Sequence, residues 1–357
     1  MASVTLSLIL EKIASRDKDF RYMATSDLAN ELAKDSFRFD SPASEKQVSD
    51  VVLTQLEDSS GDISGLAVKC LGYLVNKNRT EQLQEVVAAL CSKLLTSNKE
   101  QLRDVASLGL KTVVAELSSK KAGTLVAAAT PRLIEGLQAQ ASDVVSSSLD
   151  ILAELTARYG GVLPDQEGLK RALLPELDES RAGVRKRAIQ CLASLAASLP
   201  PHSLDDLCAT VFARLESRGL KQDTARTYVQ AVAGISKSVG NKFGKHLPRA
   251  VPLCIRYLRV AAEGDEELRE YCLQALESFV LRSPQDEVYP KVAPVLVQRF
   301  KEREETVKQD VFQAYVDLLR QVGLAARRSD GAATGLLRAD IPAVMRAVSR
   351  QLRHKSA

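Results

Sequence analysis

Apolar and small side chains recur along this chain with a period of about 41 residues. In each unit, an apolar residue is followed by small or apolar residues four and eight positions later, which places all three on one face of a helix. Eight such units lie in register, and the pattern therefore predicts eight amphipathic helices. The first apolar residues of the eight patterns are Phe20, Ile63, Leu102, Val144, Val184, Ala225, Leu268 and Val307.

A second amphipathic segment precedes each of these predicted helices. Examples are residues 4–13, 45–56, 80–95, 168–177, 203–215, 247–258 and 288–300. The twelve prolines support the division, because proline is tolerated only at helix starts and in turns. None of them lies in the windows 17–32, 60–75, 99–114, 141–156, 181–196, 221–236, 265–280 and 304–319.

The two segments of each unit predict a helical hairpin, and no sustained strand-like alternation is present. A period near 41 residues fits HEAT and armadillo repeats, whereas tetratricopeptide and ankyrin repeats are shorter, at about 33–34 residues. One hairpin cannot bury its own apolar stripe, so successive hairpins must stack. We therefore predict an all-α fold, a HEAT-repeat, armadillo-like α-solenoid superhelix of about eight helical hairpins.

The predicted domain organisation follows from the period. Residues 1–320 form the solenoid, residues 321–339 a linker, and residues 340–357 the first helix of an incomplete further repeat. This last helix opens at Asp340–Val344 and runs to Leu352 without a partner. Because a solenoid normally ends in a polar cap, we expect the repeat array to be interrupted here.

Composition and charge narrow the classes of partner. The chain is 45% hydrophobic, 4% aromatic and 26% charged, which is typical of a globular protein. Its net charge is +4, but residues 320–357 hold eight basic and two acidic residues, a net of +6, and the remainder is −2. The repeats therefore lack the clustered positive charge that nucleic-acid binding requires. No segment approaches a membrane span.

The six cysteines (Cys70, Cys91, Cys191, Cys208, Cys254 and Cys272) contain no Cys-x-x-Cys spacing. Five of them lie in apolar periodic runs, which favours small buried hydrophobic residues over a metal or redox site. The apolar start Met1–Leu10 has no preceding basic region and is interrupted by Glu11 and Lys12, unlike a secretory signal. Reduced thiols in such a chain predict a cytoplasmic and nuclear protein.

No catalytic motif emerges from the sequence. Gly240–Lys245 has three residues between its glycines where a phosphate-binding loop needs four, and His246 occupies the position of the magnesium-binding Ser or Thr. No nucleophile elbow or His-Glu-x-x-His is present, and the three histidines are scattered. We therefore expect no enzyme activity, no catalytic residues, no cofactor or metal, and no small-molecule substrate.

Basic residues recur directly after the first apolar position of the repeat. Five of the eight copies have Arg and one has Lys, and we interpret them as bonding an acidic or carbonyl group of the neighbouring repeat. The run Arg185, Lys186 and Arg187 opens a predicted helix against the preference of the helix dipole, so it is a candidate partner contact. Lys69 and Lys111 are further basic candidates. The acidic start Asp265–Glu267 agrees with the dipole and is interpreted as structural.

Several segments resemble the cullin-associated, NEDD8-dissociated family, also called the TIP family. Residues 11–13 and 17–28 resemble its amino terminus, and residues 65–71, 99–104 and 265–279 agree in order. The likeness covers nearly the whole chain, and residues 26–37 are especially similar to plant-like members. Two departures stand out. Family members are much longer, and an acidic insertion and a further repeat that follow the region matching Tyr289 and Pro290 are missing here.

The resemblance implies a non-catalytic regulator of cullin-RING ubiquitin ligases. Such proteins wrap around a cullin and its RING-box subunit when the cullin lacks its ubiquitin-like modifier, cover the neddylation lysine, and promote assembly and substrate-receptor exchange of SCF-type complexes. This chain represents the amino-terminal part, so binding near the RING-box end is expected, with receptor exchange impaired or supplied by another chain.

Two alternatives remain open at this stage. A general HEAT-repeat scaffold or nuclear-transport adaptor should bind a transport GTPase or basic cargo. An inert truncated product should aggregate through its exposed last apolar stripe.

Overall fold

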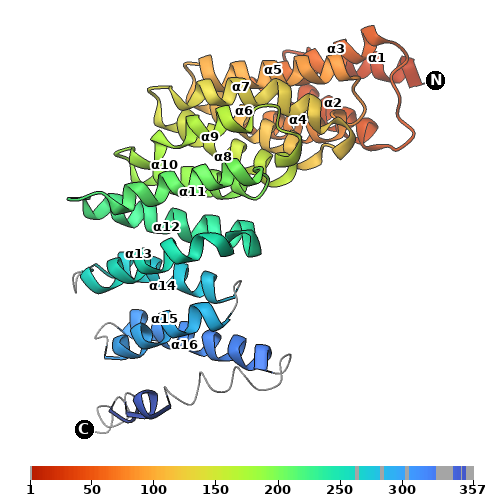
Figure 1. The fold of residues 1–357 in the computed structure, drawn as a ribbon. Helices are drawn as coiled ribbons and strands as arrows, with labels where there is room; N and C mark the ends of the chain where they lie inside the picture. The colour runs from red at the N-terminus through yellow and green to blue at the C-terminus, as the bar shows by residue number, and fades with distance from the viewer. Residues whose placement is uncertain are drawn as a thin grey trace. The chain divides into compact units, whose positions relative to one another are not determined.

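The structure, a computed structural model, describes residues 2–261, 265–281, 285–301, 305–326, 341–346 and 348–350. These residues form helices and connecting loops, and no strand occurs among them (Figure 1). The predicted all-α fold is confirmed.

The chain forms two compact units, residues 1–173 and residues 174–357. The first unit contains α1 (Ala2–Ile13), α2 (Lys18–Ala33), α3 (Pro42–Gln55), α4 (Gly61–Leu74), α5 (Thr80–Thr96), α6 (Glu100–Glu116), α7 (Ala122–Leu137), α8 (Ser142–Tyr159) and α9 (Gln166–Leu173). The second contains α10 (Ala182–Ala196), α11 (Pro201–Glu216), α12 (Gln222–Val239), α13 (Leu247–Val260), α14 (Glu266–Leu281), α15 (Gln285–Arg299) and α16 (Glu305–Ala326). Short 3₁₀ helices are η1 (Ser119–Lys121), η2 (Gly160–Val162), η3 (Pro175–Asp178) and η4 (Gly240–His246).

The even-numbered helices are the second helices of the predicted pairs. Each begins one residue after the start of its predicted window, as for α2 at Lys18 and α14 at Glu266. The first helices differ more from expectation. The segment predicted at 168–177 is divided into α9 and η3, and prolines lie in the interior of α7 (Pro131), α13 (Pro252) and α15 (Pro290 and Pro294). The predicted boundaries at residues 320 and 340 stay predictions; α16 continues to Ala326, and residues 327–340 lie outside the described part.

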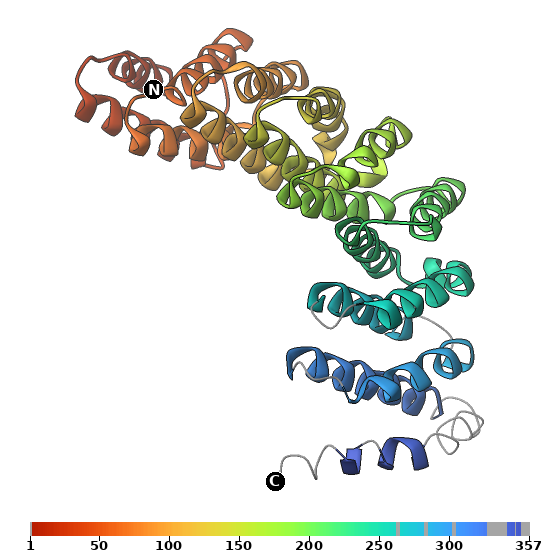
Figure 2. The ribbon, with the colours of Figure 1, turned by 90° about the vertical axis from the view of Figure 1, so that its left-hand side faces the viewer.

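Within each unit, helices of the same kind stack on one another (Figures 1 and 2). In the first unit α2, α4, α6 and α8 form one layer, and α3, α5, α7 and α9 form the other. In the second unit α10, α12, α14 and α16 form one layer, and α11, α13 and α15 form the other, while η3 packs on α10. Two-layer stacking of this kind is the arrangement of HEAT-repeat solenoids.

The periodic positions explain this packing. All eight residues at the last position of the pattern are buried, from Leu28 and Leu71 to Leu276 and Tyr315. At the first position, where Leu102 is half-buried, Phe20 is 53% exposed. Its helix, α2, begins the layer and packs on α1 and α4, so no earlier pair of described helices covers this ring.

A candidate partner-binding surface

Arginine side chains connect consecutive second helices within each unit. Each guanidinium bonds an acceptor that lies on, or directly before, the next second helix of the layer. The contacts are Arg21 Nε to Asp58 Oδ2 at 2.7 Å, Arg103 Nε to Asp143 Oδ2 at 2.6 Å, Arg185 Nε to Thr227 Oγ1 at 3.1 Å, and Arg226 Nε to Asp265 Oδ1 at 2.7 Å. The predicted bond to an acidic group of the neighbouring repeat is confirmed for Arg21, Arg103 and Arg226. At Arg185 the acceptor on the neighbouring repeat is instead a threonine hydroxyl.

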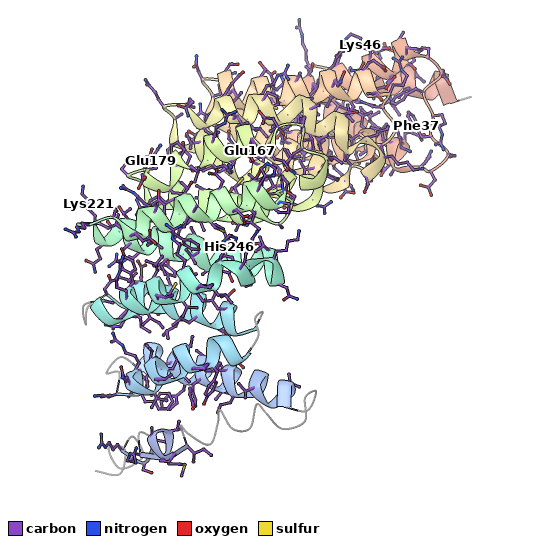
Figure 3. The ribbon with its side chains drawn as sticks, in the orientation of Figure 1. Phe37, Lys46, Glu167, Glu179, Lys221 and His246 are labelled. Carbon is purple, nitrogen blue, oxygen red and sulfur yellow. The ribbon has the colours of Figure 1, made fainter. Side chains whose placement is uncertain are left out.

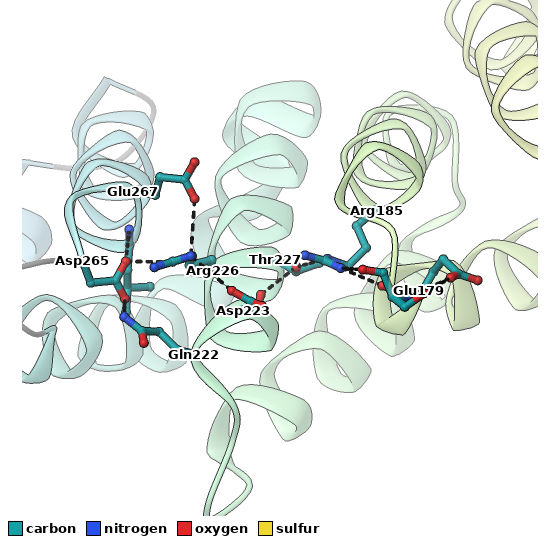
Figure 4. Close-up of polar contacts among 10 residues, drawn as sticks. Glu179, Arg185, Gln222, Asp223, Arg226, Thr227, Asp265 and Glu267 are labelled. Atoms are coloured by element: carbon teal, nitrogen blue, oxygen red, sulfur yellow. Dashed lines mark hydrogen bonds and ion pairs between the residues drawn. The ribbon is translucent and has the colours of Figure 1, made fainter. Parts of the chain in front are cut away.

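The guanidinium groups of Arg21, Arg103 and Arg185 also bind carbonyls just before their own helix. Arg185 donates to the carbonyls of Glu179 and Ser180, both at 2.7 Å, and Arg103 donates to that of Ser97 at 2.9 Å. These carbonyl dipoles offset the unfavourable placement of a cation at a helix amino terminus. These three arginines therefore fix both the entry into their own helix and the position of the next helix, as Figure 4 shows for Arg185.

Asp265 is the most buried member of this set, with a side chain that is 0% exposed. It accepts hydrogen bonds from Arg226, from Gln222 and from the backbone N–H of Leu268, and it thereby caps the start of α14. Burial pushes the pKa of Asp265 upward, but the hydrogen bonds from Gln222 and Arg226 outweigh it and lower the pKa below its usual value. The structural interpretation of this acidic helix start is confirmed for Asp265.

The five predicted contact residues lie on three helices, α4, α6 and α10. Lys69 is exposed on α4, and Lys111 on α6 lies 3.2 Å from Asp150 of α8. Arg185 is half-buried in its contact with Thr227, and Arg187 donates to the carbonyl of Gly183 at 3.2 Å. Lys186 points outward from α10 and is exposed. Their role in binding a partner stays a prediction.

Lys186 lines a groove on the second-helix layer of the second unit. We call it the glutamine groove; it lies across α10, α12 and α14 and has a volume of about 620 Å³. Its lining residues are Lys186, Ile189, Gln190, Ala193, Ser194, Gln230, Ala233, Gly234, Lys237, Ser238, Gln274, Glu277 and Ser278. Apart from Lys186, sequence reasoning missed these residues, because amide and small side chains at helical spacing form no recognised motif.

Close helix packing shapes the floor of the glutamine groove. A Cβ atom added at Gly234 would lie 3.3 Å from Cβ of Ala193, so α12 approaches α10 closely here. On the other side, the hydroxyls of Ser236 and Ser278 are 2.8 Å apart and connect α12 to α14. The groove is therefore built on three helices held in fixed register.

The cysteines behave as predicted. All six are buried, and burial raises the pKa of Cys70, Cys91, Cys208 and Cys254 to about 12. Such thiols stay protonated and unreactive at neutral pH. Within the described part of the chain, no group of three His, Cys, Asp or Glu residues could hold a metal ion. None of the helices described is long and apolar enough to cross a membrane.

His246 lies in η4 of the second unit, where Figure 3 labels it, and we expect it to make the stability of this unit depend on pH. Burial lowers the pKa of His246, Lys245 adds to the decrease, and Asp205, 3.2 Å away, opposes it. As pH falls, the imidazole is therefore protonated in the unfolded chain before it is protonated in the folded chain. The free energy of unfolding is retained above the ordinary pKa near 6.5 and decreases as pH falls below it. We expect His246→Gln to reduce the change in unfolding free energy between pH 7.5 and 5.5, measured by urea denaturation.

The same substitution at His202, which is exposed on α11, is the matched control and should retain the profile of the unmodified chain. An unchanged pH profile in His246→Gln would contradict the assignment of this dependence to the buried imidazole.

The stacked helix pairs and their arginine contacts define a HEAT-repeat solenoid protein, and solved structures support this class. The chain is similar to Kap95p, in a structure of its complex with RanGDP, with a TM-score of 0.64 and 14% identity over 96% of this chain and 47% of that chain. It is also similar to Kap121p, with a TM-score of 0.59 and 15% identity over 90% of this chain and 34% of that chain. These likenesses establish the fold. No protein-family model matches the chain.

Sequence relatives identify the particular group. The chain is 36% identical to the cullin-associated NEDD8-dissociated protein 1 of Arabidopsis thaliana over 442 residues, covering 100% of this chain and 36% of the relative. It is 34% identical to the Drosophila melanogaster protein of the same name, in a match that covers 98% of this chain and 35% of the relative. An Emericella nidulans protein, named as the N-terminal part of cullin-associated NEDD8-dissociated protein 1, is 26% identical. This match covers 74% of this chain and 85% of the relative. The chain is thus a homologue of the amino-terminal portion of the cullin-associated NEDD8-dissociated proteins.

The chain spans about a third of the length of the full-length relatives it matches. The alignment with the Arabidopsis protein extends over 442 positions, whereas the chain has 357 residues. At least 85 positions (442 minus 357) therefore have no residue in this chain. The predicted loss of an insertion and a further repeat stays a prediction.

Proposed function

We propose that this chain is a non-catalytic regulator of cullin-RING ubiquitin ligases. It binds a cullin with its RING-box subunit when the cullin lacks its ubiquitin-like modifier, and it shields the lysine that accepts the modifier. The observation that carries the proposal is the similarity, along the whole chain, to proteins whose name states their association with cullins. The likeness to Kap95p and Kap121p, at 14–15% identity, concerns the fold and gives no support to a transport function.

The architecture suits capture of a large partner. Stacked second helices present long, regular surfaces, and solenoids use such surfaces to bind proteins. Exposed side chains of these layers, such as Lys69 in the first unit and Lys186 in the second, are available for contacts. Stable complexes of signalling proteins bury about 2,000 Å² or more, and a repeat array supplies this area without a deep pocket.

The chain spans about a third of the full-length relatives. Capture of the unmodified cullin–RING-box complex is the part of the family function that we propose for it. We further propose that the protein acts in the cytoplasm and the nucleus, where its partner ligases and reduced thiols would coexist.

Protection of the acceptor lysine gives a direct test. We expect the purified chain to slow conjugation of the modifier to a cullin–RING-box complex, because bound chain blocks access to the lysine. When the concentration of the chain is about nine times the dissociation constant, about 90% of the complex is occupied. The initial rate of conjugation should then fall about tenfold.

The control is the loading of the modifier onto its conjugating enzyme, which should proceed at the same rate with and without the chain. A conjugation rate that stays constant at saturating chain would overturn the shielding role.

A further inference from the structure

We propose that the glutamine groove binds an extended, acidic peptide segment. This inference goes beyond the proposed function, because it concerns a defined site on α10, α12 and α14 and a class of partner segment that any protein could present. Three features of the groove support it: one glutamine from each helix, two lysines, and a floor of small side chains.

The glutamines match the backbone of an extended chain. Gln190, Gln230 and Gln274 come from α10, α12 and α14, so each helix contributes one primary amide. A primary amide both donates and accepts hydrogen bonds, as a peptide group does. Packed helices lie about 8–10 Å apart, and an extended chain advances about 3.3 Å per residue. Glutamines on neighbouring helices therefore meet peptide groups three residues apart.

The charge of the groove favours acidic side chains. Lys186 and Lys237 are exposed at the groove and form no ion pair with any described residue. Glu277 is the one acidic residue of the lining, so the lining carries a net charge of +1. Charge complementarity of this kind directs both the rate and the specificity of association.

The floor allows a backbone to approach closely. Ala193, Ser194, Gly234 and Ser238 present no bulky side chain, and the contact between Gly234 and Ala193 brings the two helices together beneath the groove. Sites for drug-like molecules are lined mainly by hydrophobic and aromatic side chains, and single-stranded nucleic acids stack on aromatic rings. The lining of the glutamine groove contains no aromatic residue, which favours a peptide over both.

Fluorescence anisotropy tests the proposal with a labelled peptide of twelve alternating Glu and Thr residues, which is acidic and favours an extended conformation. We expect saturable binding at moderate ionic strength, weakened about tenfold or more by Lys186→Glu and by Lys237→Glu. Lys242→Glu is the matched control, because Lys242 is exposed on η4 of the same unit and lies outside the groove. It should change the dissociation constant less than about twofold.

A second probe tests recognition of the peptide groups. The same peptide with N-methyl groups on alternate backbone nitrogens keeps its charge but loses donors, and it should bind about tenfold more weakly, as should the unmodified peptide to Gln230→Ala. Circular dichroism melting confirms that each variant is folded. Absence of saturable binding, equal binding of a Lys–Thr peptide, or an equal loss in Lys242→Glu would each overturn the proposal.

Discussion

Replacing Arg226 by Met should lower the free energy of unfolding of the second unit by about 3 kcal/mol. The substitution leaves the carboxylate of Asp265 buried, with a side chain 0% exposed, after its charged partner is removed. Removing one partner of a buried ion pair typically costs about 3–5 kcal/mol. The lower end applies because Arg226 is itself 27% exposed and Asp265 retains hydrogen bonds from Gln222 and from Leu268.

The Arg226→Met substitution should also make the second unit less resistant to acid. In the unmodified chain the lowered pKa of Asp265 adds stability above its ordinary value of 3.8, and this stability is lost as pH falls through the folded-state pKa. Without Arg226 the effect of burial on this pKa is less opposed, so the contribution of Asp265 should be smaller and its loss complete at a higher pH.

Hydrogen exchange over α12 and α14, together with urea denaturation, measures this effect, because repeat arrays can unfold in parts. Arg320→Met is the matched control: Arg320 is 67% exposed and pairs with Asp317 one turn away, so its loss should cost less than about 0.5 kcal/mol. The double variant Arg226→Met with Asp265→Asn should recover part of the stability. An Arg226→Met variant as stable as Arg320→Met would contradict the structural role of the contact.

Truncation of Phe279 to Ala should cost about 3–5 kcal/mol. This α14 ring is 0% exposed and stacks on Phe243 of η4, with centroids 5.5 Å apart and an interplanar angle of 11°. The ring of Phe243 in turn packs against the ring of Phe212 in α11, with their centroids 6.4 Å apart. Removing the ring leaves a cavity between the two layers, and close-packed helices collapse only partly into such a space.

The exposed ring of Phe20 provides the control for the aromatic truncation. Phe20 is 53% exposed at the start of α2, so Phe20→Ala should change the unfolding free energy by less than about 0.5 kcal/mol. Thermal and urea unfolding of the two variants should separate clearly. Equal stability of Phe279→Ala and Phe20→Ala would show that the stacked rings do not support this part of the second unit.

The sequence predicted the second helices closely because two independent signals agree there. Apolar side chains repeat at helical spacing, and proline is excluded from the same windows. Residues next to the helix starts reinforce the boundary, as Asp17 does by accepting the N–H groups of Asp19 and Phe20. The first helices carry weaker signals. In α7 an interior proline, Pro131, interrupts the pattern, and the segment that ends with η3 changes from α-helix to 3₁₀ helix near Pro175.

The candidate site was less predictable, because it depends on contacts between residues about 40 positions apart. Arg185 fits two interpretations in the sequence, a structural contact and a partner contact, and its bond to Thr227 supports the first. The groove arises where Gly234 meets Ala193. Neither residue carries a signal of its own, and only the packing of α12 on α10 brings them together.

The central claim is that this chain recognises an unmodified cullin–RING-box complex. Isothermal titration of the purified chain into that complex, and into the same complex carrying its ubiquitin-like modifier, tests this most directly. We predict saturable binding to the unmodified complex and no measurable binding to the modified one. Equal binding to both forms, or binding to neither by a chain whose circular dichroism shows folded helices, would contradict the proposed function.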